Sequence, residues 1–386
     1  MLRVLELFGG IGACSKALKR LKIPYEIADY VEIDKYAVKS FNAIHKTNFE
    51  PQDICQWDKD IDVDLIMHGS PCQDFSVAGK QLGGDENSGT RSSLMYETIR
   101  IVDKLRPKYV IWENVKNVIS RKHKHNWDKY VQRMKELGYT SYAKVMNAKN
   151  YGIPQNRERV FTISIRDDLN QEFKFPKPKP LKLKLKDMLE NKVDEKYYLS
   201  DKAIIYALDL NNVQVGTKWE GSTANGSINK DIAMTIGCRS ASSQRAGITN
   251  YVLDNCEKEI PVKTLKQQLC NELIKKGKVE ENDMIRHSYT TWRKEKEFHT
   301  ENKRNNNISA TLTTRPDTLG VTVNQPPLRI RKLTPKECWR LMGFDDEDFD
   351  KAEKVNSNAQ LYKQAGNSIV VNVLQEILKE LIKENK

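Results

Sequence analysis

The chain has 386 residues, of which 39% are apolar and 30% charged, a composition typical of a globular protein with room for two domains. The formal net charge of +12 favours a polyanionic partner such as nucleic acid. Seven scattered cysteines without a Cys-x-x-Cys pair indicate neither a zinc site nor a disulfide framework. No basic leader or long apolar run is visible, so we expect a cytoplasmic protein without a membrane segment or a metal.

The first part of the chain alternates between strand-like and helix-like patterns. Apolar runs predict strands at residues 2–8, 26–31, 63–67, 109–112, 141–146 and 160–165. Amphipathic stretches predict helices at residues 14–21, 94–105 and 127–137. This alternation is typical of an α/β domain with a mostly parallel sheet, which binds ligands outside the carboxyl ends of its strands.

Glycines follow the first predicted strand and precede the first predicted helix. We call residues 8–12 (Phe8, Gly9, Gly10, Ile11 and Gly12) the glycine loop, whose backbone amides suit a ligand at a helix N-terminus. Glu32 ends the second strand and suits ribose hydroxyls, and Asp53 is a further candidate. The loop is also close to the dinucleotide fingerprint, so a nicotinamide oxidoreductase is a rival on this segment, as is a purely structural turn.

A thiol and a carboxylate lie at the ends of two further strands. Cys72 follows Pro71 and precedes a segment rich in glycine and small polar residues, which predicts a mobile loop able to close over a substrate. Glu113 ends the strand at residues 109–112 and is followed by Asn114. A thiolate can add to an electron-poor ring while a carboxyl group hydrogen-bonds that ring, so the pair indicates covalent chemistry on a nucleobase.

Two arginines precede the last strand of this part. Arg157 and Arg159 alternate along residues 155–159, and in an extended chain their side chains point to one side. They are suited to phosphate or base oxygens, although a surface ion-pair ladder with Glu158 is the alternative.

The regular pattern breaks in the middle of the chain. Three alternating prolines at residues 175–180 predict a linker, and the segments 216–247 and 303–320 predict a loop-rich second domain with one helix near 262–276. Apolar positions between residues 369 and 382 then mark one face of a C-terminal helix, with Asn367 or Ser368 as its cap. We expect this helix to pack back on the first sheet.

With these residues identified, the chain closely resembles the DNA cytosine-C5 methyltransferases of bacteria and their phages. Residues 8–12 are similar to the family's cofactor loop, 71–73 to its nucleophile motif, 113–115 to its acid motif and 155–159 to its arginine motif. Residues 331–338 and 364–368 match its two late motifs. Six motifs in the family's order are far more specific than any single motif, and the likeness covers almost everything outside the middle region.

The resemblance implies a Rossmann-like S-adenosylmethionine-dependent methyltransferase fold with a smaller, β-containing target-recognition domain. The catalytic domain would comprise residues 1–180 and 328–386, and the recognition domain residues 181–327. Where members often carry a tryptophan that packs on the adenine, this chain has Ile33, while Phe8 remains for the other face. The implied donor-binding residues are those of the glycine loop with Glu32, Ile33, Asp53, Ile54, Pro71, Leu94, Asn367 and Ser368.

The resemblance also implies the chemistry. The Cys72 thiolate attacks C6 of a flipped-out cytosine, Glu113 holds N3 and the exocyclic amine, and Arg159 holds the O2 edge. Double-stranded DNA is the implied partner of a monomeric enzyme. Side-chain types suited to base edges and phosphates predict DNA contacts at Ser76, Arg239, Ser242, Gln244, Arg245, Arg293, Lys294, Arg304, Thr311 and Arg315.

Some alternatives remain open from the sequence. The family's Thr-Leu element matches Thr311 and Leu312 by distance, whereas Thr235 and Ile236 fit the glycine-rich context before them. A tRNA cytosine-C5 methyltransferase is the second enzyme hypothesis, and the long basic middle region favours duplex DNA over it. A protein that only binds DNA is disfavoured because nucleophile and acid are both intact.

Overall fold

The computed structural model describes residues 1–71, 91–200, 231–236, 251–254 and 329–383. The chain divides into two compact units. The first unit contains Met1–Met188, Thr235–Ala241 and Pro335–Lys386, so it is built from both ends of the chain. The second unit contains Leu189–Met234 and Ser242–Thr334.

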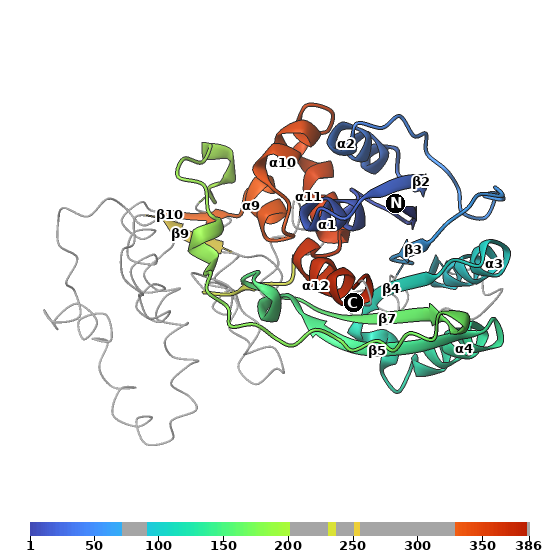
Figure 1. Cartoon of the computed structure of the whole chain (residues 1–386). Coiled ribbons are helices and arrows are strands. Elements are labelled where there is room, and N and C mark those ends of the chain that lie inside the picture. Colours follow the sequence, from blue (N-terminus) through green and yellow to red (C-terminus); the bar gives the residue numbers. More distant parts are fainter. Residues whose placement is uncertain (72–90, 201–230, 237–250, 255–328, 384–386) are drawn as a thin grey trace, which may run out of the picture. The chain divides into compact units, whose positions relative to one another are not determined.

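A six-stranded sheet forms the centre of the first unit (Figure 1). Its order is β2-β1-β3-β4-β7-β5, and β7 alone runs antiparallel to its neighbours β4 and β5. The mostly parallel sheet predicted from the alternating pattern is therefore confirmed. The strands are β1 (Leu2–Leu7), β2 (Tyr25–Val31), β3 (Leu65–His68), β4 (Tyr109–Val115), β5 (Tyr139–Asn147) and β7 (Glu158–Arg166).

Helices of the first unit come from both ends of the chain. The N-terminal part supplies α1 (Ala13–Leu21), α2 (Lys35–His45), α3 (Met95–Leu105) and α4 (Lys124–Glu136). The C-terminal part supplies α9 (Pro335–Arg340), α10 (Asp346–Glu353), α11 (Asn358–Asn367) and α12 (Val371–Leu381). In Figure 1 the red C-terminal helices lie beside the blue N-terminal ones, and α12 packs on α1 while α10 packs on α2.

The expected cap of the C-terminal helix is wrong. The N-cap of α12 is Val370, without a side-chain hydrogen bond, whereas Asn367 still belongs to α11 and Ser368 is the C-cap of α11. Ser368 has an extended backbone (φ −73°, ψ 163°) that ends α11 and turns the chain before α12 begins. Asn367 is therefore the last residue of α11, and Ser368 lies in the turn between the two helices, at the edge of the site described below.

The proline-rich segment at residues 175–180 is held against the first unit. Its backbone accepts a hydrogen bond from Tyr151 through Pro176 O (3.1 Å) and donates one from Lys179 N to Asn150 O (2.8 Å). Lys179 also forms an ion pair with Glu376 on α12 at 2.6 Å. Regular structure resumes only at the short 3₁₀ helix Leu185–Met188, the last element of the first segment of this unit.

The described part of the second unit contains β9 (Tyr251–Asp254) paired antiparallel with β10 (Arg329–Lys332). Arg329 forms an ion pair with Glu195 and stacks its guanidinium 3.7 Å from the ring centroid of Tyr198. The helix expected near 262–276 lies outside the described residues. Short elements elsewhere are β6 (Gln155–Asn156), β8 (Ala233–Met234) and the 3₁₀ helices Arg91–Leu94, Lys116–Ile119, Ala148–Tyr151, Asp167–Leu169 and Glu195–Tyr197.

Candidate active site

The glycine loop leaves β1 and enters α1 with a backbone that favours glycine at two points. Gly10 and Gly12 have φ of +55° and +79°, in the left-handed region. A Cβ on Gly9 would lie 2.6 Å from the Tyr30 ring, and one on Gly12 would lie 2.2 Å from His45. A Cβ on Gly10 would meet nothing within 4 Å, so this residue borders open space.

Glu32 ties the end of β2 to the glycine loop. Its two carboxylate oxygens accept hydrogen bonds from the backbone of Gly10 (3.1 Å) and of Asp34 (2.9 Å). Burial raises the pKa of this carboxyl group, and the two backbone donors oppose the shift. Each carboxylate oxygen has a second lone pair, so the group can still accept from a ligand hydroxyl.

Asp53 is brought close to Glu32 through the backbone, because Gln52 N donates to Glu32 O at 2.9 Å. The Asp53 side chain accepts a hydrogen bond from Cys55 N at 3.0 Å. Ile33 follows Glu32 and is 69% exposed, a large apolar side chain open to a ligand. Ile54 is buried in one apolar cluster of the core, and the partly buried Phe8 and Leu94 pack against that cluster.

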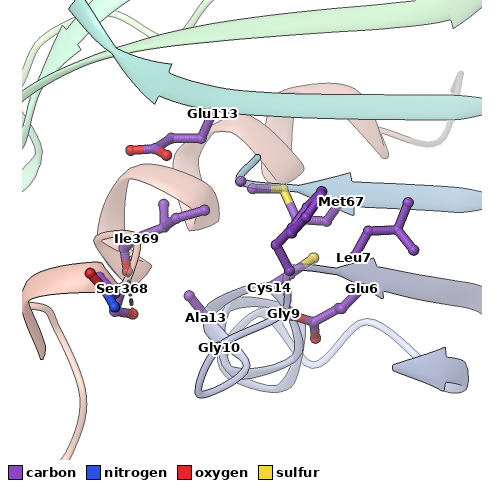
Figure 2. Close-up of a pocket in the computed structure, with 13 residues that line it drawn as sticks. Glu6, Leu7, Gly9, Gly10, Ala13, Cys14, Met67, Glu113, Ser368 and Ile369 are labelled. Atoms are coloured by element: carbon purple, nitrogen blue, oxygen red, sulfur yellow. Dashed lines mark hydrogen bonds between the residues drawn. The ribbon is translucent and has the colours of Figure 1, made fainter. Parts of the chain in front are cut away.

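A pocket opens where the glycine loop, the ends of β3 and β4, and the turn between α11 and α12 converge (Figure 2). Its empty space is about 410 Å³, part of which is open to solvent. Figure 2 shows Glu113 reaching in from β4 on the side of Ser368 and Ile369, with Gly9 and Gly10 opposite. The lining residues are Glu6, Leu7, Phe8, Gly9, Gly10, Ala13, Cys14, Met67, Gly69, Glu113, Asn367, Ser368 and Ile369.

Glu6 is a pocket residue that sequence reasoning missed. Its carboxyl is buried and accepts hydrogen bonds from the backbone N (3.0 Å) and the hydroxyl of Ser15 on α1. Burial raises its pKa to about 7. The only available signal was an acidic residue between the apolar residues Leu5 and Leu7.

Glu113 is the acidic residue that the sequence places near the end of β4. It is 8% exposed, and its Oε1 lies 3.0 Å from Arg159 Nε in an ion pair. The antiparallel pairing of β4 with β7 creates this contact, because it places Val115 opposite Arg159. Burial raises the pKa of Glu113, and the positive charges of Arg159 and Arg157 oppose the shift.

The end of β3 lies directly beside this acid. A Cβ on Gly69 would stand 3.7 Å from Glu113 Oε2. Two side chains of β4 hold the next residue, Ser70: Trp112 Nε1 donates to its hydroxyl at 2.9 Å, and Asn114 Nδ2 donates to its carbonyl at 3.3 Å. Cys72 itself lies outside the described residues, two positions beyond this anchored serine.

The structure places Arg157 differently from the sequence expectation. Its guanidinium does not face open space but is 4% exposed and donates to three backbone carbonyls, those of Ile236, Gly366 and Ser368. Arg159, two residues later, reaches Glu113 instead. The alternation along the chain was visible in the sequence, but the carbonyls come from segments 79 to 211 residues away.

The remaining predicted site residues divide into two groups. Ile11, Gly12, Glu32, Ile33, Asp53, Ile54, Pro71, Leu94, Arg157 and Arg159 are described but do not line this pocket. The predicted DNA contacts lie outside the described residues: Ser76, Arg239, Ser242, Gln244, Arg245, Arg293, Lys294, Arg304, Thr311 and Arg315. Among the described residues, no cluster of three or more His, Cys, Asp or Glu side chains could hold a metal ion. No helix of the described ranges is long and apolar enough to cross a membrane.

Solved structures place this architecture in a known fold class. A methyltransferase of Entamoeba histolytica, EhMeth, superposes with a TM-score of 0.68 at 16% identity, covering 100% of this chain and 99% of that one. A DNMT2 variant from Spodoptera frugiperda has a TM-score of 0.65 at 21% identity, covering 99% and 100%. The fold is therefore the Rossmann-like fold of S-adenosylmethionine-dependent methyltransferases.

Sequence comparison narrows the class to a family. The model of the C-5 cytosine-specific DNA methylase family matches residues 2–383. The chain is 34% identical over 430 residues to the orphan methyltransferase M.SPRI of Bacillus phage SPR, covering 99% of this chain and 97% of that protein. It is 32% identical over 388 residues to the type II methyltransferase M.HhaI of Haemophilus parahaemolyticus, covering 97% and 93%. The chain belongs to the C-5 cytosine-specific DNA methylase family.

Proposed function

We propose that this enzyme transfers a methyl group from S-adenosylmethionine to C5 of a cytosine in a specific duplex DNA sequence. The observation that carries the proposal is the ion pair of the buried Glu113 with the half-buried Arg159, in which Glu113 lies beside Gly69 and lines a pocket together with the glycine loop. This arrangement offers an acid and a cation to one substrate ring, next to the chain segment that leads into the nucleophile motif.

The donor site is supported by the cradle around Gly10. Its open Cβ direction lets a ligand approach the backbone closely, and Glu32 holds spare lone pairs for ribose hydroxyls. Ile33 and Phe8 supply apolar surface for an adenine. When bound, the donor supplies an electrophilic methyl group on a sulfonium sulfur.

Asp53→Ala and Glu32→Ala are each expected to weaken donor binding by on the order of 1 kcal/mol, measured by calorimetry. Unchanged affinity in both variants would mean that the donor site is misplaced.

The cytosine would be activated from two sides. The Cys72 thiolate forms a bond to C6, while Glu113 hydrogen-bonds N3 and the exocyclic amine and Arg159 holds O2. The resulting electron density at C5 accepts the methyl group. C5 then loses its proton to a base, and the C6–S bond breaks to release thiolate and product. The raised pKa of Glu113 favours the protonated form that can donate to N3.

Base flipping is part of the proposal, because C5 and C6 lie inside the stack of a duplex. Extruding the cytosine costs a few kcal/mol, which contacts to the DNA must offset. We assign those contacts and the choice of sequence to the region 181–327, which includes Arg239, Gln244, Arg245, Thr311 and Arg315. Exchanging this region with that of a related enzyme should move methylation to the other enzyme's site; an active chimera that still methylates the original site would place specificity elsewhere.

The test is expression of the chain in host cells free of 5-methylcytosine, followed by sequencing with 5-methylcytosine detection. We expect methylation at one short motif, and none with Cys72→Ser. Tritium transfer from labelled donor to duplex DNA and to tRNA then compares the two substrates. Transfer to tRNA alone would replace this proposal with the RNA enzyme, and transfer to neither would refute both.

A further inference from the structure

The arginine motif contains a second group of contacts that the proposed chemistry does not use. Arg159 meets Glu113, but the preceding alternate residues, Gln155 and Arg157, bind backbone groups of distant segments. Gln155 is fully buried and Arg157 nearly so. Long polar side chains are seldom buried unless their hydrogen-bonding groups are engaged, so these contacts determine where the two side chains can lie.

The backbone N–H and the carbonyl of Ile236 are both hydrogen-bonded to side chains of the arginine motif. Its N–H donates to Gln155 Oε1 at 3.0 Å, and its carbonyl accepts from Arg157 Nη1 at 3.0 Å. Thr235 adds a bond from its hydroxyl to Asn156 O at 2.8 Å. Gln155 is itself fixed, because its Nε2 donates to Leu341 O at 2.8 Å.

The other end of the Arg157 guanidinium holds the wall of the pocket. Nη2 donates to Gly366 O at 3.1 Å and to Ser368 O at 2.8 Å. Ser368 lines the pocket in the turn between α11 and α12. One rigid, planar, permanently charged group thus joins Ile236 to the pocket wall, and a lysine could not reproduce this forked geometry.

We propose that Gln155 and Arg157 are positioning residues that fasten the segment 235–236 to the pocket wall. Resting on the proposed function, the inference is that donor binding and DNA binding are coupled through Arg157. The segment continues in sequence toward Arg239 and Gln244, the side chains assigned above to DNA. If either the wall or the segment moved alone, buried groups would lose their partners, so the two are expected to move together.

Hydrogen exchange of the free enzyme tests whether Gln155 and Arg157 attach the segment 235–236 to the pocket wall, and it needs no activity measurement. Arg157→Lys should raise amide exchange at least tenfold both at Ile236 and in the 366–369 turn. Gln155→Met, of similar shape but without an amide, should raise exchange at Ile236 alone. The matched control is Arg166→Lys on β7, whose guanidinium binds Arg106 O and Asp168 on the opposite end of the strand, and it should change neither segment. An Arg157→Lys effect confined to one segment, or absent from both, would overturn the inference.

Steady-state kinetics on plasmid DNA test the coupling. Arg157→Lys should raise the KM for S-adenosylmethionine and the KM for DNA together, each by roughly five- to tenfold, with a smaller change in kcat. A merely structural defect would lower the active fraction and therefore kcat, with both KM values unchanged, and that result would contradict the coupling. An inactive wild type would refute the proposed function, while the exchange data would still decide the fastening.

Discussion

Replacing Glu6 with Gln should stabilise the protein above neutral pH and leave its stability almost unchanged near pH 4.5. Glu6 is fully buried where β1 meets the N-terminus of α1, and Ser15 donates to it twice. Gln keeps the size and one acceptor oxygen but carries no charge. The substitution therefore isolates the free energy of holding a carboxylate at this position.

The magnitude follows from the pKa of Glu6. Burial raises it from the ordinary 4.5 to about 7, so the folded protein binds one more proton than the unfolded chain between these values. The contribution of the group to stability is full below pH 4.5 and is lost as the pH rises through 7. The loss amounts to about 3 kcal/mol. The positive end of the α1 dipole favours the carboxylate by about 0.3–1 kcal/mol, which reduces the loss but does not reverse it.

Urea unfolding at pH 5 and pH 8, followed by tryptophan fluorescence, measures the effect. The free energy of unfolding of Glu6→Gln should exceed that of the wild type by about 2–3 kcal/mol at pH 8, with a much smaller difference at pH 5. Glu26→Gln is the control, because Glu26 is exposed on β2 and should follow the wild type at both pH values. A constant difference between Glu6→Gln and the wild type at the two pH values would refute the reasoning.

Two further substitutions probe the acid and the nucleophile segment. Arg159→Met removes the main positive charge that lowers the pKa of Glu113, so the alkaline limb of the kcat/KM profile should move to higher pH in an enzyme of reduced activity; an unmoved limb would show that another group sets it. Trp112→Phe removes the shorter of two hydrogen bonds to Ser70 Oγ and leaves a cavity, so it should cost about 2–4 kcal/mol by thermal unfolding and lower kcat tenfold or more. An unchanged kcat in the folded Trp112→Phe variant would mean that this bond does not position the nucleophile segment.

Sequence periodicity predicted the sheet well because its strands are short apolar runs bounded by polar turns. Every strand expected before residue 166 is present, with ends that differ by a few residues, as β4 continuing to Val115 illustrates. The place of β7 between β4 and β5 was not predictable, since pairing partners and direction depend on the folded arrangement. The same pairing brings Arg159 to Glu113, a contact that the sequence did not predict.

Other parts of the site depend on contacts between distant residues. Ser368 was expected to cap a helix because its residue type suits a cap, yet α11 continues to Asn367 and the serine turns the chain at the pocket wall. Arg157 was expected to bind phosphate or base oxygens because of its residue type and its alternation with Arg159. Its partners in the structure are backbone carbonyls, which no sequence pattern predicts. Glu6 was missed because a strand pattern reports burial but not which buried position meets a helix N-terminus.

The central claim is that Cys72 adds to a cytosine held by Glu113, and one measurement tests it most directly. The enzyme is incubated with S-adenosylmethionine and a duplex in which 5-fluorocytosine replaces the target base, then denatured and analysed by peptide mass spectrometry. Fluorine cannot leave C5 as a proton does, so a stable protein–DNA adduct at Cys72 is predicted, with none in Cys72→Ser. An enzyme that methylates ordinary cytosine but forms no such adduct, or forms it at another residue, would contradict the account.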